Sequence, residues 1–137
     1  MIQAIDICKS FGEPEIQVLH NLNFIIPDGE FVSITGRSGS GKSTLLYILS
    51  SLDLPSSGKI MIENEDMTKM TELEIHQFRN QKMGFVFQFH YLLPELTALE
   101  NVLMPARKSG QHISKHEYGM HLLEQFGLGE KASRLPK

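Results

Sequence analysis

Hydrophobic residues alternate with polar ones in the first part of the chain, and this pattern predicts short strands joined by turns. A first strand begins at Ile2, and a second covers residues 18–26, in which Leu22, Phe24 and Ile26 alternate onto one face. Pro27-Asp28-Gly29 is a turn signal, because Pro fixes φ and Gly accepts positive φ. The apolar segment Phe31–Thr35 then predicts a return strand, so that residues 18–35 read as a hairpin.

The pattern changes in the middle of the chain. Residues 42–52 predict a helix that is apolar on nearly every side and is therefore expected to be buried. Pro and Gly within Asp53–Gly58 end this helix and turn the chain. Residues 59–63 alternate like an exposed strand, and Gly84–Gln88 predicts a short apolar strand that ends in a lone amide.

Three further helix starts carry the capping-box pattern, in which Ser or Thr is followed three residues later by Glu. They are Thr71 with Glu74, Thr97 with Glu100, and Ser114 with Glu117. The third predicted helix is the clearest, since apolar residues recur every four positions from Tyr118 to Phe126 and Gly127 supplies a left-handed stop.

Composition narrows the class of protein. The chain has 137 residues, 41% apolar and 21% charged, which suits one ordinary globular domain. Its net charge of −3 argues against a nucleic-acid partner, since a phosphate-backbone binder shows a basic excess. A single cysteine, Cys8, excludes an intramolecular disulfide framework and fits a reducing compartment. Apolar runs of about five residues are too short to span a membrane. We therefore expect a soluble, cytoplasmic chain with no direct membrane insertion.

Nine consecutive residues match the phosphate-binding pattern G-x-x-x-x-G-K-[ST]: Gly36, Arg37, Ser38, Gly39, Ser40, Gly41, Lys42, Ser43 and Thr44. Glycines let successive backbone N–H groups point at an anion, and the following helix aims its N-terminal N–H groups at the same place. Lys42 adds a charge for the terminal phosphates, and the Ser43 hydroxyl can ligate Mg²⁺. A Gly- and Ser-rich connector is the alternative, but the predicted strand and helix on either side favour a nucleoside triphosphate site.

The loop alone does not say what the nucleotide is used for. A GTPase is not supported, because neither Asn-Lys-x-Asp nor Asp-x-x-Gly occurs in the sequence. A small P-loop kinase stays open, although few arginines follow the loop to hold a second phosphorylated substrate: Arg79, Arg107 and Arg134. A non-catalytic nucleotide-binding module also stays open.

Three histidines near the last helix, at positions 112, 116 and 121, suggest a metal site at first sight. The helix start expected at Ser114 separates the first two, and i, i+5 spacing puts the last pair on different helix faces. We therefore interpret His112, His116 and His121 as solvated residues and do not expect them to bind a metal.

Four segments outside the loop complete a pattern: Lys9-Ser10-Phe11-Gly12, Asp53–Gly58, Gly84–Gln88 and Phe89–Val102. Together with the loop they resemble the ATP-binding subunit of an ABC transporter, over the whole length of the chain. The last segment resembles, more narrowly, the lipoprotein-releasing and macrolide-exporter branch of that family.

This resemblance implies roles for two further residues. Phe11 corresponds to the aromatic residue that stacks on adenine, and Gln88 to the glutamine that touches Mg²⁺ and the attacking water and senses the membrane partner. Lys42 and Gln88 would then be the catalytic residues, Ser43 and Gln88 the metal ligands, and ATP and Mg²⁺ the cofactors. The plainer alternatives are that Phe11 is an ordinary aromatic residue and Gln88 an amide at a strand end.

The resemblance also implies an α/β fold: an antiparallel β-subdomain, the P-loop strand and helix of a RecA-like core, and the start of a helical subdomain. Residues 1–92 would hold the first two parts and residues 93–137 the third, all within a single nucleotide-binding domain. Its implied partners are a transmembrane permease, which would hold it at the inner membrane, and a second ATP-binding domain. The implied activity is a transport-coupled ATPase, for lipoprotein release or drug export.

Two family motifs do not occur in the sequence: the Leu-Ser-Gly-Gly-Gln signature and an apolar strand that ends in Asp-Glu. Arg134–Lys137 is similar to the lead-in to the signature. We therefore expect these residues to be the N-terminal part of a longer protein. We also expect them to bind ATP and Mg²⁺ on their own but to hydrolyse ATP negligibly, because water activation lies outside them.

Overall fold

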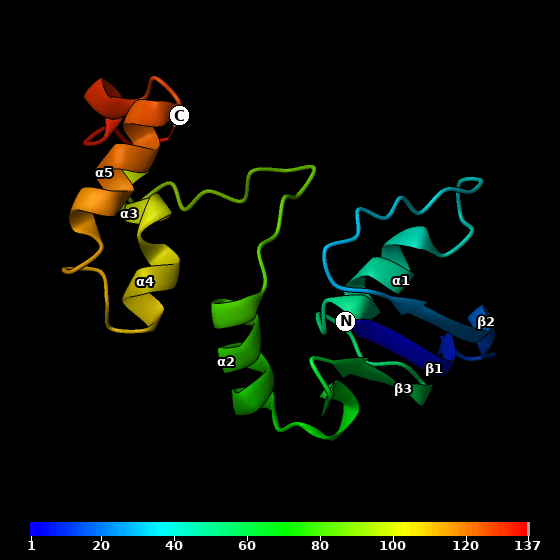
Figure 1. The fold of residues 1–137 in the computed structure, drawn as a ribbon. Helices are drawn as coiled ribbons and strands as arrows, with labels where there is room; N and C mark the ends of the chain where they lie inside the picture. Colours follow the sequence, from blue (N-terminus) through cyan, green and yellow to red (C-terminus); the bar gives the residue numbers. More distant parts are fainter. Residues whose placement is uncertain (137) are drawn as a thin grey trace. The chain divides into compact units, whose positions relative to one another are not determined.

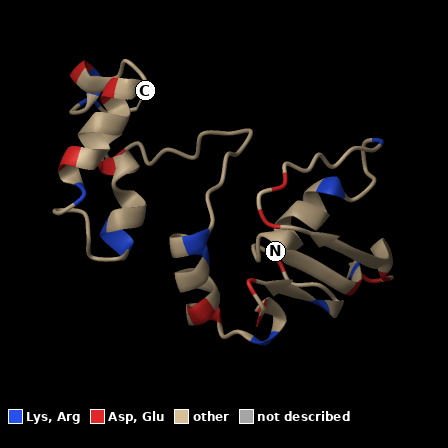
Figure 2. Ribbon diagram, in the orientation of Figure 1, with Lys and Arg blue, Asp and Glu red and all other residues tan. Residues whose placement is uncertain are grey.

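The computed structural model describes residues 1–136, which divide into two compact units (Figure 1). The first unit contains residues 1–84, and the second begins at Phe85. This division falls eight residues before the boundary expected from the sequence, between residues 92 and 93. Acidic and basic residues are interspersed in both units (Figure 2). Every helix in the described part falls short of the length and apolar character that crossing a bilayer requires.

The first unit is built on a four-stranded sheet with the order β2-β1-β3-β4. The strands are β1 (Ile2–Phe11), β2 (Ile16–Ile26), β3 (Ser57–Ile62) and β4 (Glu65–Asp66), and each neighbouring pair is antiparallel. The helices of this unit are α1 (Lys42–Leu49), the short 3₁₀ helix η1 (Met67–Lys69) and α2 (Glu72–Lys82). The expected antiparallel β layer, the strand near residues 59–63 and the capping box of Thr71 with Glu74 are confirmed.

The hairpin has different partners from those that the sequence predicted. β1 and β2 pair along their lengths, with Ile2 opposite Ile26 and Phe11 opposite Ile16. The return strand predicted over Phe31–Thr35 was wrong, since this segment forms no strand and the Phe31 side chain is 96% exposed. No described strand runs beside the segment, so its backbone has no ladder to join.

β1 carries a bulge that decides which of its residues are buried. Between the pairs Ala4–Phe24 and Ile7–Leu22, three residues of β1 advance against two of β2. Ala4 and Ile7 are therefore both buried, although strict alternation would put them on opposite faces. Opposite the bulge lies Gly58, at φ +87°, where a Cβ would come within 2.3 Å of the Asp6 carbonyl oxygen. Only glycine fits there.

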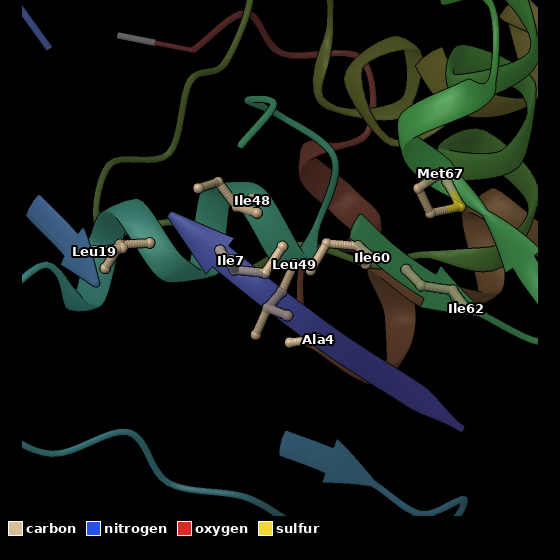
Figure 3. Packing of buried hydrophobic residues seen from close by; sticks show 8 residues of the cluster. All are labelled: Ala4, Ile7, Leu19, Ile48, Leu49, Ile60, Ile62 and Met67. Atoms are coloured by element: carbon tan, nitrogen blue, oxygen red, sulfur yellow. The ribbon is translucent and has the colours of Figure 1, made fainter. Parts of the chain in front are cut away.

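The core of the first unit lies between the sheet and α1 (Figure 3). It consists of eight buried apolar residues: Ala4, Ile7, Leu19, Ile48, Leu49, Ile60, Ile62 and Met67. The prediction that α1 is buried on all sides was wrong. Ile48 and Leu49 are buried, whereas Leu46 and Tyr47 are about half exposed, because within the described residues the sheet covers one face of the helix.

The second unit is helical, with α3 (Ala98–Val102), α4 (Met104–Lys108), α5 (His116–Gln125) and the 3₁₀ helix η2 (Gly129–Lys131). The capping box of Thr97 with Glu100 is confirmed at the start of α3. The strand predicted over Gly84–Gln88 was wrong: the segment is irregular and the Val86 side chain is fully exposed. As at Phe31–Thr35, no described strand lies beside it.

The helix α5 differs from its prediction in where it begins and in which face it buries. It begins at His116 without a side-chain cap, so the predicted capping box of Ser114 with Glu117 was wrong. The Ser114 hydroxyl instead donates to the Gln111 carbonyl at 3.0 Å. The repeat that begins at Tyr118 is largely exposed, while Gly119 and Leu123 are buried. The left-handed stop at Gly127 is confirmed by its φ of +68°.

Candidate functional site

The phosphate-binding segment folds as a loop that leads directly into α1. Gly36, Gly39 and Gly41 have φ angles of 153°, 77° and 87°, and the Ser40 N–H donates to the Arg37 carbonyl at 3.2 Å. Glycines with positive φ allow a loop to turn consecutive N–H groups toward an anion. Residues 36–40 are exposed and therefore accessible to a ligand.

Lys42 folds its side chain back onto the loop. Its ammonium donates to the carbonyls of Gly36 at 2.9 Å and Arg37 at 2.7 Å. An ammonium has three N–H donors, so one donor remains that no contact within residues 1–136 engages. Lys42 therefore fixes the entrance of the loop and keeps a positive charge beside it.

The first turn of α1 adds further positive character. Gly41 is the N-cap, and the Leu45 N–H makes the first intrahelical bond, to the Gly41 carbonyl at 2.8 Å. The N–H groups of the three preceding residues have no acceptor within the helix. Residues 31–52 include two basic residues and no acidic one. This end of α1 therefore favours an anion.

Gly41 seats the loop against β2. A Cβ at this position would lie 2.8 Å from Leu19 Cδ2 and 3.1 Å from Val18 Cγ1. Leu19 is in turn paired with Lys9 on β1, and the hairpin closes two residues further on, at Phe11 opposite Ile16. The structure therefore brings Phe11 and the loop to the same end of the sheet.

Phe11 presents part of its ring at this end. Its side chain is 46% exposed, and the Lys9 ammonium lies 4.9 Å from the ring centroid. A partly exposed aromatic ring at the same end of the sheet as a phosphate-binding loop is suited to base stacking. The structure thus places Phe11 and the loop together in the first unit.

Gln88 belongs to the second unit, whereas the loop belongs to the first. Gln88 is exposed, in the irregular segment before α3. Aromatic residues flank it in sequence and contact one another. The Phe87 ring stacks on that of Phe85, with 5.7 Å between ring centroids, and meets the Tyr91 ring edge-on, with 5.3 Å between centroids. Gln88 therefore sits in an exposed segment whose aromatic rings pack together.

The residues present fit a magnesium ion that arrives with phosphates. Ser43 is exposed in the first turn of α1, and its hydroxyl oxygen is a suitable Mg²⁺ ligand. Mg²⁺ is commonly held by substrate phosphates and a small number of protein oxygens rather than by a complete protein cage. In residues 1–136, no three His, Cys, Asp or Glu side chains gather to form such a cage.

The sequence did not reveal which residues support the site. Val18 and Leu19 form the floor under Gly41, and Lys9 donates to Asp53 Oδ1 at 2.8 Å. The two-residue period of a strand could have placed Lys9 and Phe11 on one face. No local pattern indicates a contact between Lys9 and Asp53, because they lie 44 residues apart.

Comparisons with known proteins agree on one family. A family model described as "ABC transporter" matches residues 19–137. The lipoprotein-releasing system ATP-binding protein LolD of Leptospira interrogans is 57% identical over 130 residues, which cover 95% of this chain and 54% of that protein. LolD of Aquifex aeolicus is 52% identical over 121 residues, 88% of this chain and 54% of that protein. The chain thus spans about half the length of these relatives.

Solved structures show the same fold. A dimeric structure of the ATP-binding cassette MJ0796 in a post-hydrolysis state, bound to ADP and Pi, matches with a TM-score of 0.86 at 36% identity. It covers 99% of this chain, and the match takes in 62% of that chain. A second dimeric MJ0796 structure matches with a TM-score of 0.72 at 47% identity, over 77% of this chain and 46% of that one. The expected α/β P-loop fold is confirmed.

Proposed function

Because the chain belongs to the ABC transporter family, we propose that the loop of residues 36–44 binds the phosphates of ATP together with Mg²⁺. The observation that carries this proposal is the junction at Gly41. This residue has a left-handed conformation, the first turn of α1 that follows it contains no acidic residue, and the Lys42 ammonium binds back to the loop. The dipole of α1, the free N–H groups of its first turn and the Lys42 ammonium all favour negative charge at the start of the helix. A polyphosphate is a ligand that carries such charge.

Each site residue has a role in this proposal. Lys42 neutralises the terminal phosphates, Ser43 contributes an oxygen to Mg²⁺, and the Phe11 ring stacks on adenine. The bound metal neutralises charge on the phosphate oxygens. By the family resemblance, Gln88 would contact the metal and the attacking water. These assignments combine the family resemblance with the placement of Phe11 and the loop at one end of the sheet.

For the whole protein, we propose an ATP-binding subunit of a transporter of the lipoprotein-releasing type. The support is that the relatives above are named lipoprotein-releasing system proteins. The partners would be a transmembrane permease, which holds the subunit at the inner membrane, and a second ATP-binding domain, as in the dimeric MJ0796 structures. Residues 1–92 would supply the β-subdomain and P-loop core, and residues 93–137 the start of the helical subdomain.

Calorimetry with the 137-residue chain tests the nucleotide site. We expect ATP with Mg²⁺ to bind, and Lys42→Ala to weaken the affinity about ten-fold or more, because a charge-assisted contact is lost. Lys108→Ala removes an exposed lysine of the second unit and should leave the affinity unchanged. Circular dichroism confirms that both variants keep the fold. Absence of binding at millimolar ATP, or equal affinities for the wild type and Lys42→Ala, would contradict the proposal.

Phosphate release tests the accompanying expectation that these residues do not turn ATP over by themselves. The sequence lacks an Asp-Glu strand to polarise water, so we expect no steady-state release above buffer. Turnover that disappears in Lys42→Ala would show that the water-activating group lies within residues 1–137 after all.

A further inference from the structure

Lys9 makes three contacts that the proposed nucleotide site does not yet explain. Its ammonium donates to Asp53 Oδ1 at 2.8 Å and to the Leu54 carbonyl at 2.7 Å, and it lies 4.9 Å from the centre of the Phe11 ring. The Lys9 side chain is only 12% exposed. A lysine with so little solvent exposure is held in one position by its partners.

Two of these contacts fix Lys9 to the far end of the loop's own helix. Asp53 and Leu54 follow α1, and the N–H groups of Leu52 and Asp53 both donate to the Tyr47 carbonyl in its last turn, at 2.8 and 3.1 Å. The Asp53 carboxylate also accepts from the Leu54 N–H at 2.8 Å. The turn is therefore tied to α1, and Lys9 is tied to the turn.

The third contact fixes the Phe11 ring. Lys9 and Phe11 lie two residues apart on β1. The contact of the Lys9 ammonium with the ring shows that both side chains reach the same side of the strand, although the pairing with β2 shifts register between Lys9 and Ser10. An ammonium over an aromatic ring is attracted to its π-face and restricts the orientations that the ring can adopt. The ring keeps 46% of its surface exposed, so it remains available to a ligand.

Lys9 thus connects the base-stacking ring with the helix that begins at the phosphate loop. The distance between adenine and the triphosphate in ATP is set by covalent bonds, so the ring and the loop must be held at a matching separation. On the loop side, Gly41 rests on Leu19, which is the partner of Lys9 in the sheet. Lys9 therefore contacts the ring with its side chain and, through its strand partner Leu19, adjoins the residue on which the loop rests.

We infer that Lys9 is a positioning residue for the adenine base, which holds the Phe11 ring in the orientation and place that ATP requires. The inference rests on the proposed function. It separates two parts of the ligand: the base, which depends on Lys9, and the phosphates, which depend on the loop alone. A lysine with a purely structural role would affect both parts equally.

The test compares ATP with inorganic tripolyphosphate, each with Mg²⁺, by calorimetry on the full 137-residue chain. Lys9→Met keeps the aliphatic stem and removes the ammonium. It should weaken ATP binding about three- to five-fold and leave tripolyphosphate binding unchanged. Lys59→Met removes an exposed lysine of β3 and should change neither. Lys9→Arg keeps a cation that also stacks on aromatic rings, so it should retain the wild-type ratio of the two affinities.

A double-mutant cycle shows whether Lys9 acts through Phe11. Phe11→Ala should weaken ATP binding by itself, and Lys9→Met should have no further effect in the Phe11→Ala background. Equal losses for ATP and tripolyphosphate in Lys9→Met, an unchanged ATP affinity, or an effect that persists without the ring would each overturn the inference. If Lys9→Met does not fold, a lowered ATP-to-tripolyphosphate ratio in Lys9→Arg overturns it as well.

The same data distinguish this inference from the proposed function. If the wild-type chain binds neither ligand, the proposed phosphate site fails and the inference fails with it. If both ligands bind and Phe11→Ala lowers only the ATP affinity, while Lys9→Met leaves it unchanged, the phosphate and adenine assignments stand and the role of Lys9 alone is refuted.

Discussion

The two units of the chain differ in the interactions that order each of them internally. The first unit packs eight buried apolar residues between a sheet and a helix. In the described part of the second unit, Leu123 is the single large apolar side chain that is buried, at 6% exposure. Burial of apolar area stabilises by roughly 25 cal/mol per Å², so the first unit gains most from its core. The second unit must be ordered largely by its hydrogen bonds.

Those hydrogen bonds concentrate at the start of α3, a helix of five residues. The N–H groups of Ala98 and Leu99 donate to the carbonyls of Arg134 and Ala132, at 2.8 and 3.0 Å, and the Glu100 N–H donates to the Thr97 hydroxyl. Every orphan donor of its first three residues is thus satisfied. Because an isolated helix this short is not stable in water, the caps explain why α3 forms at all.

Asn101 adds a second set of bonds in the same region. Its side-chain oxygen accepts from the Leu93 N–H at 2.8 Å, and its amide nitrogen lies within 3.1 Å of three carbonyl oxygens, those of Leu93, Leu96 and Thr97. One side chain thus holds the segment that precedes α3. The phosphate loop thus stands on a packed apolar core, whereas polar contacts order the segment before α3 in the unit that contains Gln88.

The largest expected effect comes from damage to the core. Ile7 is completely buried, and Ile7→Ala removes its packing and leaves a cavity, which should lower the free energy of unfolding by about 2–5 kcal/mol. Urea denaturation followed by circular dichroism measures the loss. Ile25→Ala, at a position that is 57% exposed, should change stability by about 0.5 kcal/mol at most. Equal losses in the two variants would contradict a core between sheet and α1.

A smaller effect, confined to the second unit, is expected from Asn101→Ala. The variant leaves the Leu93 N–H and several carbonyls without their partner, at a cost of about 2 kcal/mol. Amide hydrogen exchange should accelerate in residues 93–103 and stay unchanged in β1 and β3. Gln125→Ala, an exposed amide at the end of α5, is the matched control. Faster exchange throughout the first unit would show that the two units do not differ in the way described.

The smallest effect is a dependence on pH at the two capping boxes. Hydrogen bonds from the Thr97 backbone N–H and then from its hydroxyl lower the pKa of Glu100 below its ordinary value of 4.5. The same two donors of Thr71 lower the pKa of Glu74. Because the folded pKa lies below the unfolded one, each contribution is present above pH 4.5 and is lost as the pH falls through the lowered folded value.

NMR titration of the Glu side-chain carboxyl carbons measures both groups in one sample. We expect both midpoints below 4.5, and we expect Thr97→Ala to raise the Glu100 midpoint while leaving Glu74 unchanged. The start of α3 should also loosen in acid before the sheet does, because α3 depends on its caps. A Glu100 midpoint at or above its ordinary value would rule out the cap as the cause.

Local patterns predicted the parts of the structure that local interactions determine. The capping boxes at Thr71 and Thr97 form hydrogen bonds to backbone groups only three residues away. The glycine loop before α1 likewise bonds to its own backbone over three residues. The box at Ser114 failed because the Gln111 carbonyl takes its hydroxyl. The strands predicted at Phe31–Thr35 and Gly84–Gln88 failed for another reason: a strand requires a neighbour, which an apolar run does not specify.

The candidate site divides in the same way. Residues 36–44 could be assigned from sequence, since the loop carries its chemistry in consecutive positions. The family resemblance pointed to Phe11, but only the fold places it at the same end of the sheet as Gly41. The contact of Lys9 with Asp53 arises from the turn after α1 and has no counterpart in any short pattern.

The floor beneath Gly41 ties the loop to the register of a strand. A slip of β2 by one residue would turn Leu19 away and offer a neighbouring side chain, such as the imidazole of His20, in its place. The bulge of β1 opposes such a slip, because three residues of β1 lie against two of β2 between the pairs Ala4–Phe24 and Ile7–Leu22 in one alignment only. Anyone who transplants this loop into another scaffold must therefore carry over β2 together with the bulged strand that fixes its alignment.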